Sequence, residues 1–302
     1  MNQKPPPYEL LISIALTTLI AVASPGNAQN NSAPLRGAAL LQAEERVNPN
    51  PNKRSPIAAD SSLFLEELTW LEVRDALREG KTTIIIPTGG VEMSGPYVAV
   101  GKHNFILHVI TQRIAQQLGN ALIAPVVPFV PQGEIDPPSG NMRYPGTLSV
   151  RETTFRALLT DIANSLRVTG FRNIILIGDS GGNQDPLQQV ADSLAQQWQE
   201  ANIYYIPEYF GYQQWFAYLE EHENIQEVNE GIHDTFRDTA LMMLYDPNTV
   251  RAEQRQASDR FSVNGVPLAP VKKTLAVANR LADYQARLTV DAIQHAIDSV
   301  AP

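Results

Sequence analysis

The chain of 302 residues contains no cysteine, so disulfide bonds and thiolate metal sites are excluded. It also has few basic residues, with 23 Lys and Arg against 32 Asp and Glu and a formal net charge of −9. No basic stripe is present along the sequence, which argues against a nucleic-acid backbone as a partner. Histidine is scarce as well, with five in the chain.

A hydrophobic run long enough to cross a membrane is also missing. The N-terminal apolar run, Leu10 to Ala23, has about 14 residues, whereas a membrane-spanning helix needs about 20. Lys4 precedes this run, and small residues follow it up to Ala28. Residues 1–28 therefore resemble a secretory signal, and we expect export to a bacterial periplasm or to the exterior. An uncleaved membrane anchor is the alternative.

Residues 29–60 are rich in Asn, Pro, Ala and Ser and show no sustained periodicity. They predict a disordered linker, within which 37–46 is a possible helix. The remainder, 61–302, is predicted to form one folded domain, because a chain with 43% hydrophobic residues can build a sizeable core.

Short apolar segments alternate with helical patterns across this domain. Capping boxes at Thr69 with Glu72 and at Ser149 with Glu152 predict two helix starts. The expected strands are 82–86, 121–130, 173–177 and 203–206, and the other expected helices are 105–118, 185–200, 238–244 and 274–300. This order predicts an α/β fold with a mostly parallel sheet and helices on both faces.

Two glycine-rich loops directly follow predicted buried strands. The first, 87–104, carries Glu92 and His103, and the second, 178–183, reads Gly-Asp-Ser-Gly-Gly-Asn. Loops at strand ends hold reactive groups on a rigid base, so both are candidate site segments.

The second loop also matches the Gly-x-Ser-x-Gly turn of serine hydrolases. In that alternative Ser180 is the nucleophile, His233 or His295 is the base, and an acid such as Asp192 orients the base. The similar sequence of trypsin-like proteases belongs to all-β proteins, which the α/β pattern contradicts.

Two further loops have a composition that suits a site. The proline- and glycine-rich segment 137–149 offers Arg143 and Tyr144 as ligand contacts, and a structural clamp is equally plausible there. The segment 231–240 carries His233 and Asp238, although Asp238 could simply favour the first turn of a helix. Of the other histidines, His108 is expected to be structural and His222 to be solvated.

In their order and spacing, these four segments resemble the creatininase (creatinine amidohydrolase) family over roughly 63–244. The resemblance implies a three-layer α/β fold and a metal-dependent hydrolase of cyclic or linear amides. It also implies that Glu92 is a metal ligand, that Asp238 stands at a later ligand position, and that His233 transfers a proton. Gly101-Lys-His-Asn104 marks a divergent branch.

Departures from the family pattern fall on its ligand positions. Ser94 and Ser180 stand where the resemblance implies ligand histidines, and His103 stands where it implies a bridging aspartate. Imidazole offers one lone pair to one metal, and a serine hydroxyl is a poor ligand for zinc. The surviving set is Glu92, His103 and Asp238, which suits one zinc ion, or manganese or iron, or no metal if the site is degenerate.

The sequence therefore leads to three hypotheses for function. The first is an exported hydrolase in which a metal-activated water attacks an amide carbonyl, with Glu92 and His233 as catalytic residues. The second is a binding protein that has lost its metal ligands, and the third is a serine hydrolase using Ser180. Asp179, Ser180, Asn183, Arg143 and Ser94 are the expected substrate-binding or supporting residues, and a homo-oligomer is possible.

Overall fold

The computed structural model describes residues 50–299, so the predicted signal segment and most of the predicted linker lie outside the described residues. The chain divides into two units, Met1–Lys53 and Arg54–Pro302, and every described helix and strand belongs to the second unit. Its centre is a four-stranded sheet with the order β2-β1-β3-β4, in which all neighbouring strands are parallel. The strands are β1 (Thr83–Thr88), β2 (Ala121–Ile123), β3 (Asn173–Gly178) and β4 (Asn202–Tyr205).

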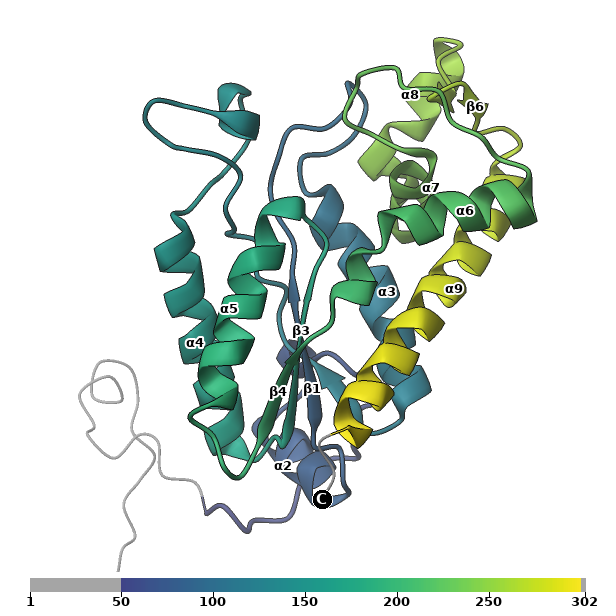
Figure 1. Ribbon diagram of the computed structural model, residues 1–302. Coiled ribbons are helices and arrows are strands. Elements are labelled where there is room, and N and C mark those ends of the chain that lie inside the picture. The colour runs from purple at the N-terminus through teal and green to yellow at the C-terminus, as the bar shows by residue number, and fades with distance from the viewer. Residues whose placement is uncertain (1–49, 300–302) are drawn as a thin grey trace, which may run out of the picture. The chain divides into compact units, whose positions relative to one another are not determined.

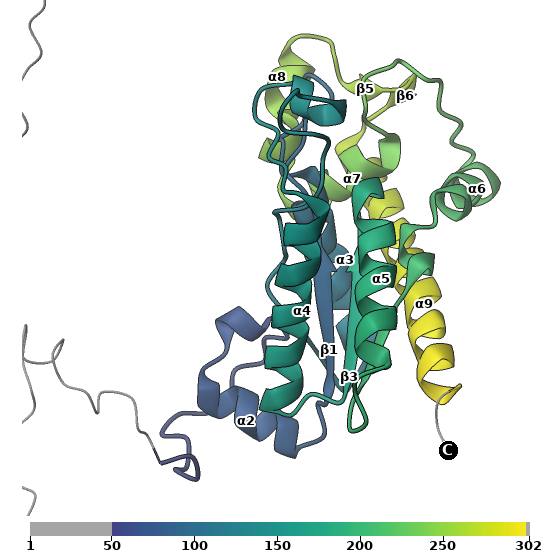
Figure 2. The ribbon, with the colours of Figure 1, turned by 60° about the vertical axis from the view of Figure 1, so that its left-hand side comes forward.

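Helices cover both faces of this sheet (Figure 1). α4 (Glu152–Thr169) and α5 (Gln184–Ala195) lie on one face, and α3 (Lys102–Leu118) and α9 (Val271–Asp298) lie on the other. Figure 2 shows α4 and α5 from their outer side, with α2 (Trp70–Arg78) at the end of the molecule opposite α8 (Ala252–Ala257). The predicted α/β architecture is confirmed.

The strands are apolar because both of their faces are buried. Along β1, Ile84 and Ile86 pack with α4 and α5, whereas Ile85 packs with α3, α7 (Phe236–Tyr245) and α9. All three isoleucines are fully buried. Successive side chains of a strand thus pack into two separate cores, one on each face of the sheet. Because a shift by one residue would exchange the two faces, this packing fixes the register of the sheet.

The remaining elements gather beyond the carboxyl ends of the strands. They are α6 (Tyr212–Glu223), α7, α8 and a small hairpin of β5 (Ser262–Val263) and β6 (Val266–Pro267), together with the 3-10 turn Gly140–Arg143 in the loop before α4 (Figure 1). Other short 3-10 turns are Leu65–Glu67, Gly181–Asn183, Pro207–Phe210 and Pro247–Val250. Ligand sites of open parallel sheets form at this end.

The two predicted capping boxes have different outcomes. At α2 the Thr69 side chain accepts from the Glu72 backbone and Glu72 accepts from the Thr69 backbone, as predicted. The second box is wrong, because α4 begins at Glu152 with Arg151 as its N-cap. The Ser149 hydroxyl instead donates to the Gly133 carbonyl at 2.8 Å and accepts from the Gln132 backbone at 2.9 Å. Ser149 therefore fixes the preceding loop.

Within residues 50–299, none of the helices has the length and apolar character required to span a membrane.

Candidate active site

The candidate site lies where β1 and β3 end and where α3 and α7 begin. The loop after β1 supplies Glu92, the first turn of α3 supplies Lys102 and His103, and the turn after β3 supplies Asp179. All of these side chains are buried. Strands that end at the same edge of a parallel sheet thus bring together residues that are up to 87 positions apart, between Glu92 and Asp179.

His103 is the centre of the site. Its Nε2 lies 2.7 Å from Oε1 of Glu92, and its Nδ1 lies 2.8 Å from Oδ2 of Asp179. An ionised carboxylate only accepts hydrogen bonds, so both ring nitrogens carry a proton when both acids are ionised. Burial lowers the pKa of His103, but the hydrogen bonds to Asp179 and Glu92 outweigh that effect and raise it overall. The imidazolium form is thereby favoured.

Two further cations complete the cluster. The Lys102 ammonium lies 3.4 Å from Oε1 of Glu92 and 3.8 Å from Oδ2 of Asp238. The Arg237 guanidinium donates to Oδ1 of Asp238 at 2.7 Å and to Oδ1 of Asp179 at 3.1 Å. Glu92, Asp179 and Asp238 thus face Lys102, His103 and Arg237, and the charges of this buried cluster balance.

This balance determines how the acids ionise. Burial raises the pKa of Glu92, but the bonded and charged neighbours His103, Lys102 and His233 outweigh it and lower that pKa to about 2. For Asp238, burial again raises the pKa, and Lys102, Arg237 and His103 lower it below its usual value. Both acids are therefore permanent anions in the physiological pH range.

The second carboxylate oxygen of Glu92, Oε2, accepts a hydrogen bond from the loop before α4. Asn141 donates to Oε2 of Glu92 at 2.7 Å and to the amide oxygen of Gln132 at 3.2 Å. Gln132 in turn donates to the Ser180 hydroxyl at 3.1 Å. The glycine at position 90 leaves space for these hydrogen bonds, because a Cβ there would lie 2.4 Å from Nε2 of Gln132.

His233 is the exposed member of the site, with 45% of its side chain accessible. Its Nδ1 lies 2.9 Å from the Met93 carbonyl oxygen and must donate, because a carbonyl only accepts. In the neutral ring the lone pair is then on Nε2, which lies 3.5 Å from Oε1 of Glu92. The backbone φ of His233 is +52°, a conformation that costs energy in a non-glycine residue and that clusters at functional sites.

A cleft of about 340 Å³ opens beside His233 and reaches Lys102 and Asp238. Tyr212 and Phe216 of α6 form an aromatic wall, and the other lining residues are Glu227, Val228, Asn229, Asp234, Thr235 and Asn264. The size and lining suit a small polar molecule.

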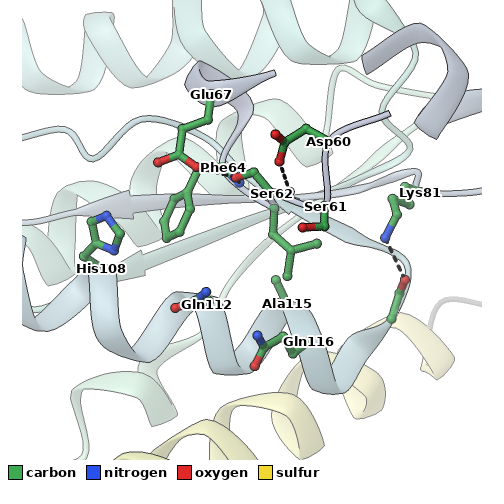
Figure 3. Close-up of a pocket in the computed structure, with 12 residues that line it drawn as sticks. Asp60, Ser61, Ser62, Phe64, Glu67, Lys81, His108, Gln112, Ala115 and Gln116 are labelled. Carbon is green, nitrogen blue, oxygen red and sulfur yellow. Dashed lines mark hydrogen bonds between the residues drawn. The ribbon is translucent and has the colours of Figure 1, made fainter. Parts of the chain in front are cut away.

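A larger cavity of about 610 Å³ lies away from this site, beside the C-terminal half of α3 (Figure 3). It is lined by Lys81, His108 and Gln112 among others, and the His108 ring packs on Phe64 with centroids 4.3 Å apart. His108 is therefore structural, as predicted. Because none of the buried acid–base cluster lines this cavity, the smaller cleft is the better candidate for chemistry.

The structure brings together five of the residues singled out from the sequence: Glu92, His103, Asp179, His233 and Asp238. Ser180 lies at the edge of this group through Gln132. Ser94 lies two residues from Glu92, and its hydroxyl is buried without a hydrogen-bond partner.

Two of the expected supporting residues have other roles. Arg143 is exposed and donates to the Gly140 carbonyl of its own loop at 3.1 Å, so its neighbour Asn141 is the residue that reaches the site. The Asn183 amide donates to the carbonyls of Thr88 and Gly89, at 3.0 and 2.9 Å, which makes it a brace between β1 and the turn after β3. Both residues thus have structural bonds around the site, and substrate contact by either of them stays a prediction.

The expected metal centre does not fit the side chains present. His103 has both nitrogens engaged by carboxylates, and Asp238 faces Arg237 and Lys102. Among residues 50–299, no group of three or more His, Asp or Glu could hold a metal ion. Glu92, His103 and Asp238 thus form part of an ion-pair cluster and not the open three-ligand site that catalytic zinc requires.

The serine-hydrolase arrangement is not assembled either. Within the described part of the chain, the Ser180 hydroxyl has Gln132 as its partner and no histidine. Asp192 is exposed on α5 and bonds to Gln188, while His295 belongs to the C-terminal half of α9. The nucleophile, base and orienting acid of that alternative therefore do not meet.

Lys102, Arg237 and Asn141 are the site residues that sequence reasoning missed. Lys102 and Arg237 both stand beside residues singled out from the sequence, His103 and Asp238. That adjacency is the available signal, but lysine and arginine are mostly exposed in proteins, so their burial here could not be expected.

Comparison with known proteins agrees with this architecture. The sequence model of the creatininase family, described as creatinine amidohydrolase, matches residues 66–283. The protein belongs to the creatininase family. Its departures at the ligand positions make it a divergent member.

The individual relatives of this chain are distant in sequence. A creatinine amidohydrolase of Pseudomonas putida is 27% identical over 38% of this chain, and a 3-dehydro-scyllo-inosose hydrolase of Thermotoga maritima is 25% identical over 40% of it. These alignments span 44% and 37% of the two relatives, less than half of their length.

Solved creatininase structures share the fold over a longer stretch. A creatinine amidohydrolase structure matches with a TM-score of 0.57 and 19% identity, covering 80% of this chain and 99% of that one. A manganese form of creatininase gives the same TM-score, and a mutant in a zinc–zinc form gives 0.55, each covering 80% of this chain and 100% of the other. The fold is thus that of the family, whose solved members include forms with divalent metals.

Proposed function

We propose that this creatininase-family protein hydrolyses a C–N bond of a small cyclic or linear amide in the cleft beside His233. The observation that carries the proposal is the position of His233, which lines the cleft and whose Nε2 lies 3.5 Å from the Glu92 carboxylate. A histidine with one ring nitrogen bonded to a backbone carbonyl and the other beside a carboxylate can act as a general base when the ring is neutral. The names of the relatives, both of them hydrolases, support the same class of reaction.

In the proposed reaction, Nε2 of His233 removes a proton from a water molecule as that water attacks the carbonyl carbon. Glu92 stabilises the imidazolium that forms, because its low pKa of about 2 keeps it an anion. The Lys102 ammonium, which lines the cleft, stabilises the negative charge on the carbonyl oxygen. The imidazolium then protonates the departing nitrogen and the C–N bond breaks. The products are a carboxylic acid and an amine, which remain in one ring-opened molecule when the amide is cyclic.

The family's solved members include manganese and zinc–zinc forms, and from the resemblance we expected one zinc, manganese or iron ion in this protein. The residues of the site do not fit such an ion, so no step of the proposed reaction uses one. The chemistry assigned above is carried by side chains of the protein.

The proposal is tested with the full-length protein and a panel of small lactams, cyclic ureas and linear amides, creatinine among them. Turnover is measured as release of amine or carboxylate. His233→Gln should lower kcat/KM at least about 100-fold, the usual contribution of a general base. His222→Gln, on the exposed end of α6, is the matched control and should leave kcat/KM unchanged. Turnover that survives in His233→Gln would contradict the proposed base.

A second candidate is a binding protein without catalysis. It is favoured by the mutual neutralisation of Lys102, His103 and Arg237 with the three acids, and by Ser94 and Ser180 at positions where the family resemblance implies histidine. Calorimetric titration with the same panel distinguishes the two functions. Binding with no product after long incubation supports the second candidate.

We further propose that the protein is exported, on the strength of the signal-type pattern in residues 1–28. N-terminal sequencing of protein recovered from a bacterial periplasm tests both export and cleavage. A chain that retains Met1 and stays with the membrane fraction supports the alternative of an uncleaved anchor. Oligomer formation stays a prediction, which light scattering of the purified protein tests.

A further inference from the structure

Two buried cations occupy the gaps between the acids of the site. The Lys102 ammonium lies between Glu92 and Asp238, and the Arg237 guanidinium lies between Asp238 and Asp179. We infer that Lys102 and Arg237 permanently supply the positive charge of this site, and that it therefore binds no divalent metal ion. The inference concerns the proposed catalytic site and rests on placing the protein's function there.

The cluster has no space for a divalent ion between these acids. A zinc or manganese ion needs ligand atoms about 2.0 to 2.2 Å away. The closest side-chain nitrogen to Asp238 is that of Arg237, at 2.7 Å, and the Lys102 ammonium stands 3.4 Å from the Glu92 carboxylate and 3.8 Å from Asp238. A metal ion that bridged these two acids would have to displace Lys102. That side chain is only 3% exposed, so it has little room to leave.

The cluster also lacks free lone pairs for a metal ion. Both nitrogens of His103 bear protons shared with carboxylates, so the ring has no electron pair for a metal. The Glu92 carboxylate is also engaged at both oxygens, by His103 on one side and by Asn141 on the other. Ligation would require several of these bonds to break together.

The charge of the cluster also opposes the binding of a divalent ion. The three acids of the cluster are already matched by three cations, and the cluster is buried. Adding an ion of charge +2 would leave an excess positive charge in a medium of low dielectric constant, where unpaired charge is costly. The same cluster without Lys102 would carry a net charge of −1, which would favour the binding of a cation in its place.

The first experiment measures metal binding by the unmodified full-length protein. We expect no zinc or manganese in stoichiometric amount after dialysis, and a shift in melting temperature below about 1 °C in 1 mM Zn²⁺ or Mn²⁺. Binding to the native state alone would raise the melting temperature by several degrees at that concentration. A stoichiometric ion that is lost in Glu92→Gln would overturn the inference.

The second experiment removes the proposed internal cation. Lys102→Ser should lower the melting temperature, and Mn²⁺ or Zn²⁺ should restore at least about half of that loss by occupying the vacated space. Lys272→Ser, at an exposed position of α9, is the matched control and should respond to neither. A Lys102→Ser protein that responds to metal no more than the unmodified protein would contradict the inference. If this variant does not fold, Lys102→Gln, which removes the charge and shortens the side chain by one atom, provides the same test.

The results of these metal-binding experiments can be distinguished from the result of the test for hydrolysis. If the unmodified protein hydrolyses a small amide, a chelator should leave kcat/KM within about twofold of its original value. Activity that disappears with chelation and returns with zinc would overturn the inference while the hydrolase proposal stands. Absence of turnover with the metal results as expected would remove the hydrolase proposal and leave the inference intact.

Discussion

At the scale of single residues, the two carboxylate oxygens of Glu92 have different neighbours and therefore different functions. Oε1 faces the cations His103 and Lys102 and also the exposed His233, while Oε2 is held by Asn141. Asn141 therefore fixes the rotation of the carboxylate that the proposed base needs. It contacts Glu92 but not the cleft, so it is a positioning residue.

The roles of Asn141 and its neighbour Arg143 can be separated by mutation. Asn141→Ala removes the hydrogen bond of 2.7 Å to the Glu92 anion. Because a bond to a charged group contributes roughly 1.5 to 3 kcal/mol, kcat/KM should fall about tenfold or more. Arg143→Ala is the control, since that side chain bonds to its own exposed loop, and it should stay within about twofold of the unmodified enzyme. Equal losses in both variants would show that the loop as a whole, and not Asn141, positions Glu92.

Asp234 provides a prediction of pH-dependent stability. Burial and the nearby Asp238 raise the pKa of Asp234 from 3.8 to about 6, against the opposing effects of Thr239, Lys102 and Thr235. The folded state thus binds the proton more tightly than the unfolded chain does. The stability contributed by the protonated carboxyl is complete below pH 3.8 and is lost as the pH rises through about 6.

Asp234→Asn removes this titration and retains a polar partner for Thr239, which bonds to Asp234 at 2.8 Å. Relative to the unmodified protein, the variant should gain about 2 kcal/mol in unfolding free energy between pH 4.5 and pH 7. Urea denaturation at the two pH values measures the gain, and Asp192→Asn on the surface of α5 is the control. A gain that is the same at both pH values would contradict the raised pKa.

The five site residues that were predictable from sequence share one property, a position in a loop or first turn next to a strand or helix end. Glu92 and Asp179 follow β1 and β3, and the alternating pattern reveals those ends. The contact of Asn141 with Glu92 was not predictable, because the direction of a side chain in an irregular loop depends on tertiary contacts. The same holds for Lys102 and Arg237, whose burial depends on partners far away in sequence.

At the scale of elements, the two capping boxes show where local signals are sufficient. Thr69 and Glu72 are bonded to each other within one helical turn, so the sequence alone specifies them. Ser149 has the same spacing to Glu152, but its hydroxyl meets Gln132 and Gly133 of the preceding loop. These bonds to residues 16 and 17 positions away replace the expected bonds between Ser149 and Glu152. A local sequence pattern cannot show that a more distant partner will be preferred.

The turn between β3 and α5 is packed too closely at Gly178 for any side chain, whereas Gly181 in the same turn has room for one. A Cβ at Gly178 would lie 2.8 Å from Leu187 and 2.9 Å from Asn183, whereas at Gly181 the nearest atom is 3.8 Å away, on Phe210. Gly178→Ala should therefore lower the unfolding free energy by about 1 to 3 kcal/mol, as overpacked cores do. Gly181→Ala should change it by less than about 0.5 kcal/mol. Urea denaturation of the pair is the measurement, and equal effects would contradict the close packing at this turn.

At the scale of the whole folded unit, the buried charges connect β3, α7 and α9 at the carboxyl edge of the sheet, where the same elements also share an apolar core. Arg237 of α7 bonds to Asp179 after β3 and to Gln285 of α9 at 3.0 Å, and Gln285 donates to the Tyr209 carbonyl before α6 at 3.0 Å. The guanidinium also lies 3.7 Å from the centre of the Trp215 ring. The site is thus part of the packing between the sheet and the helices at its carboxyl edge.

Removing Arg237 tests whether these charges are needed for folding. Arg237→Met keeps an apolar side chain over Trp215 but leaves Asp179 and Asp238 without their guanidinium partner. Breaking a buried ion pair from one side costs roughly 3 to 5 kcal/mol, a large share of the 5 to 15 kcal/mol that stabilises a typical protein. Calorimetry should therefore show a melting temperature lower by about 10 °C.

The control is the ion pair of Arg280 with Glu223 at 2.6 Å, in which the arginine side chain is 51% exposed. Arg280→Met should cost less than about 1 kcal/mol, since water replaces an exposed partner at little cost. Similar small losses for the two arginines would mean that Asp179 and Asp238 do not require internal cations. In that case the charge balance proposed for the site would be wrong, and a bound cation would again be needed to explain how three acids are buried together.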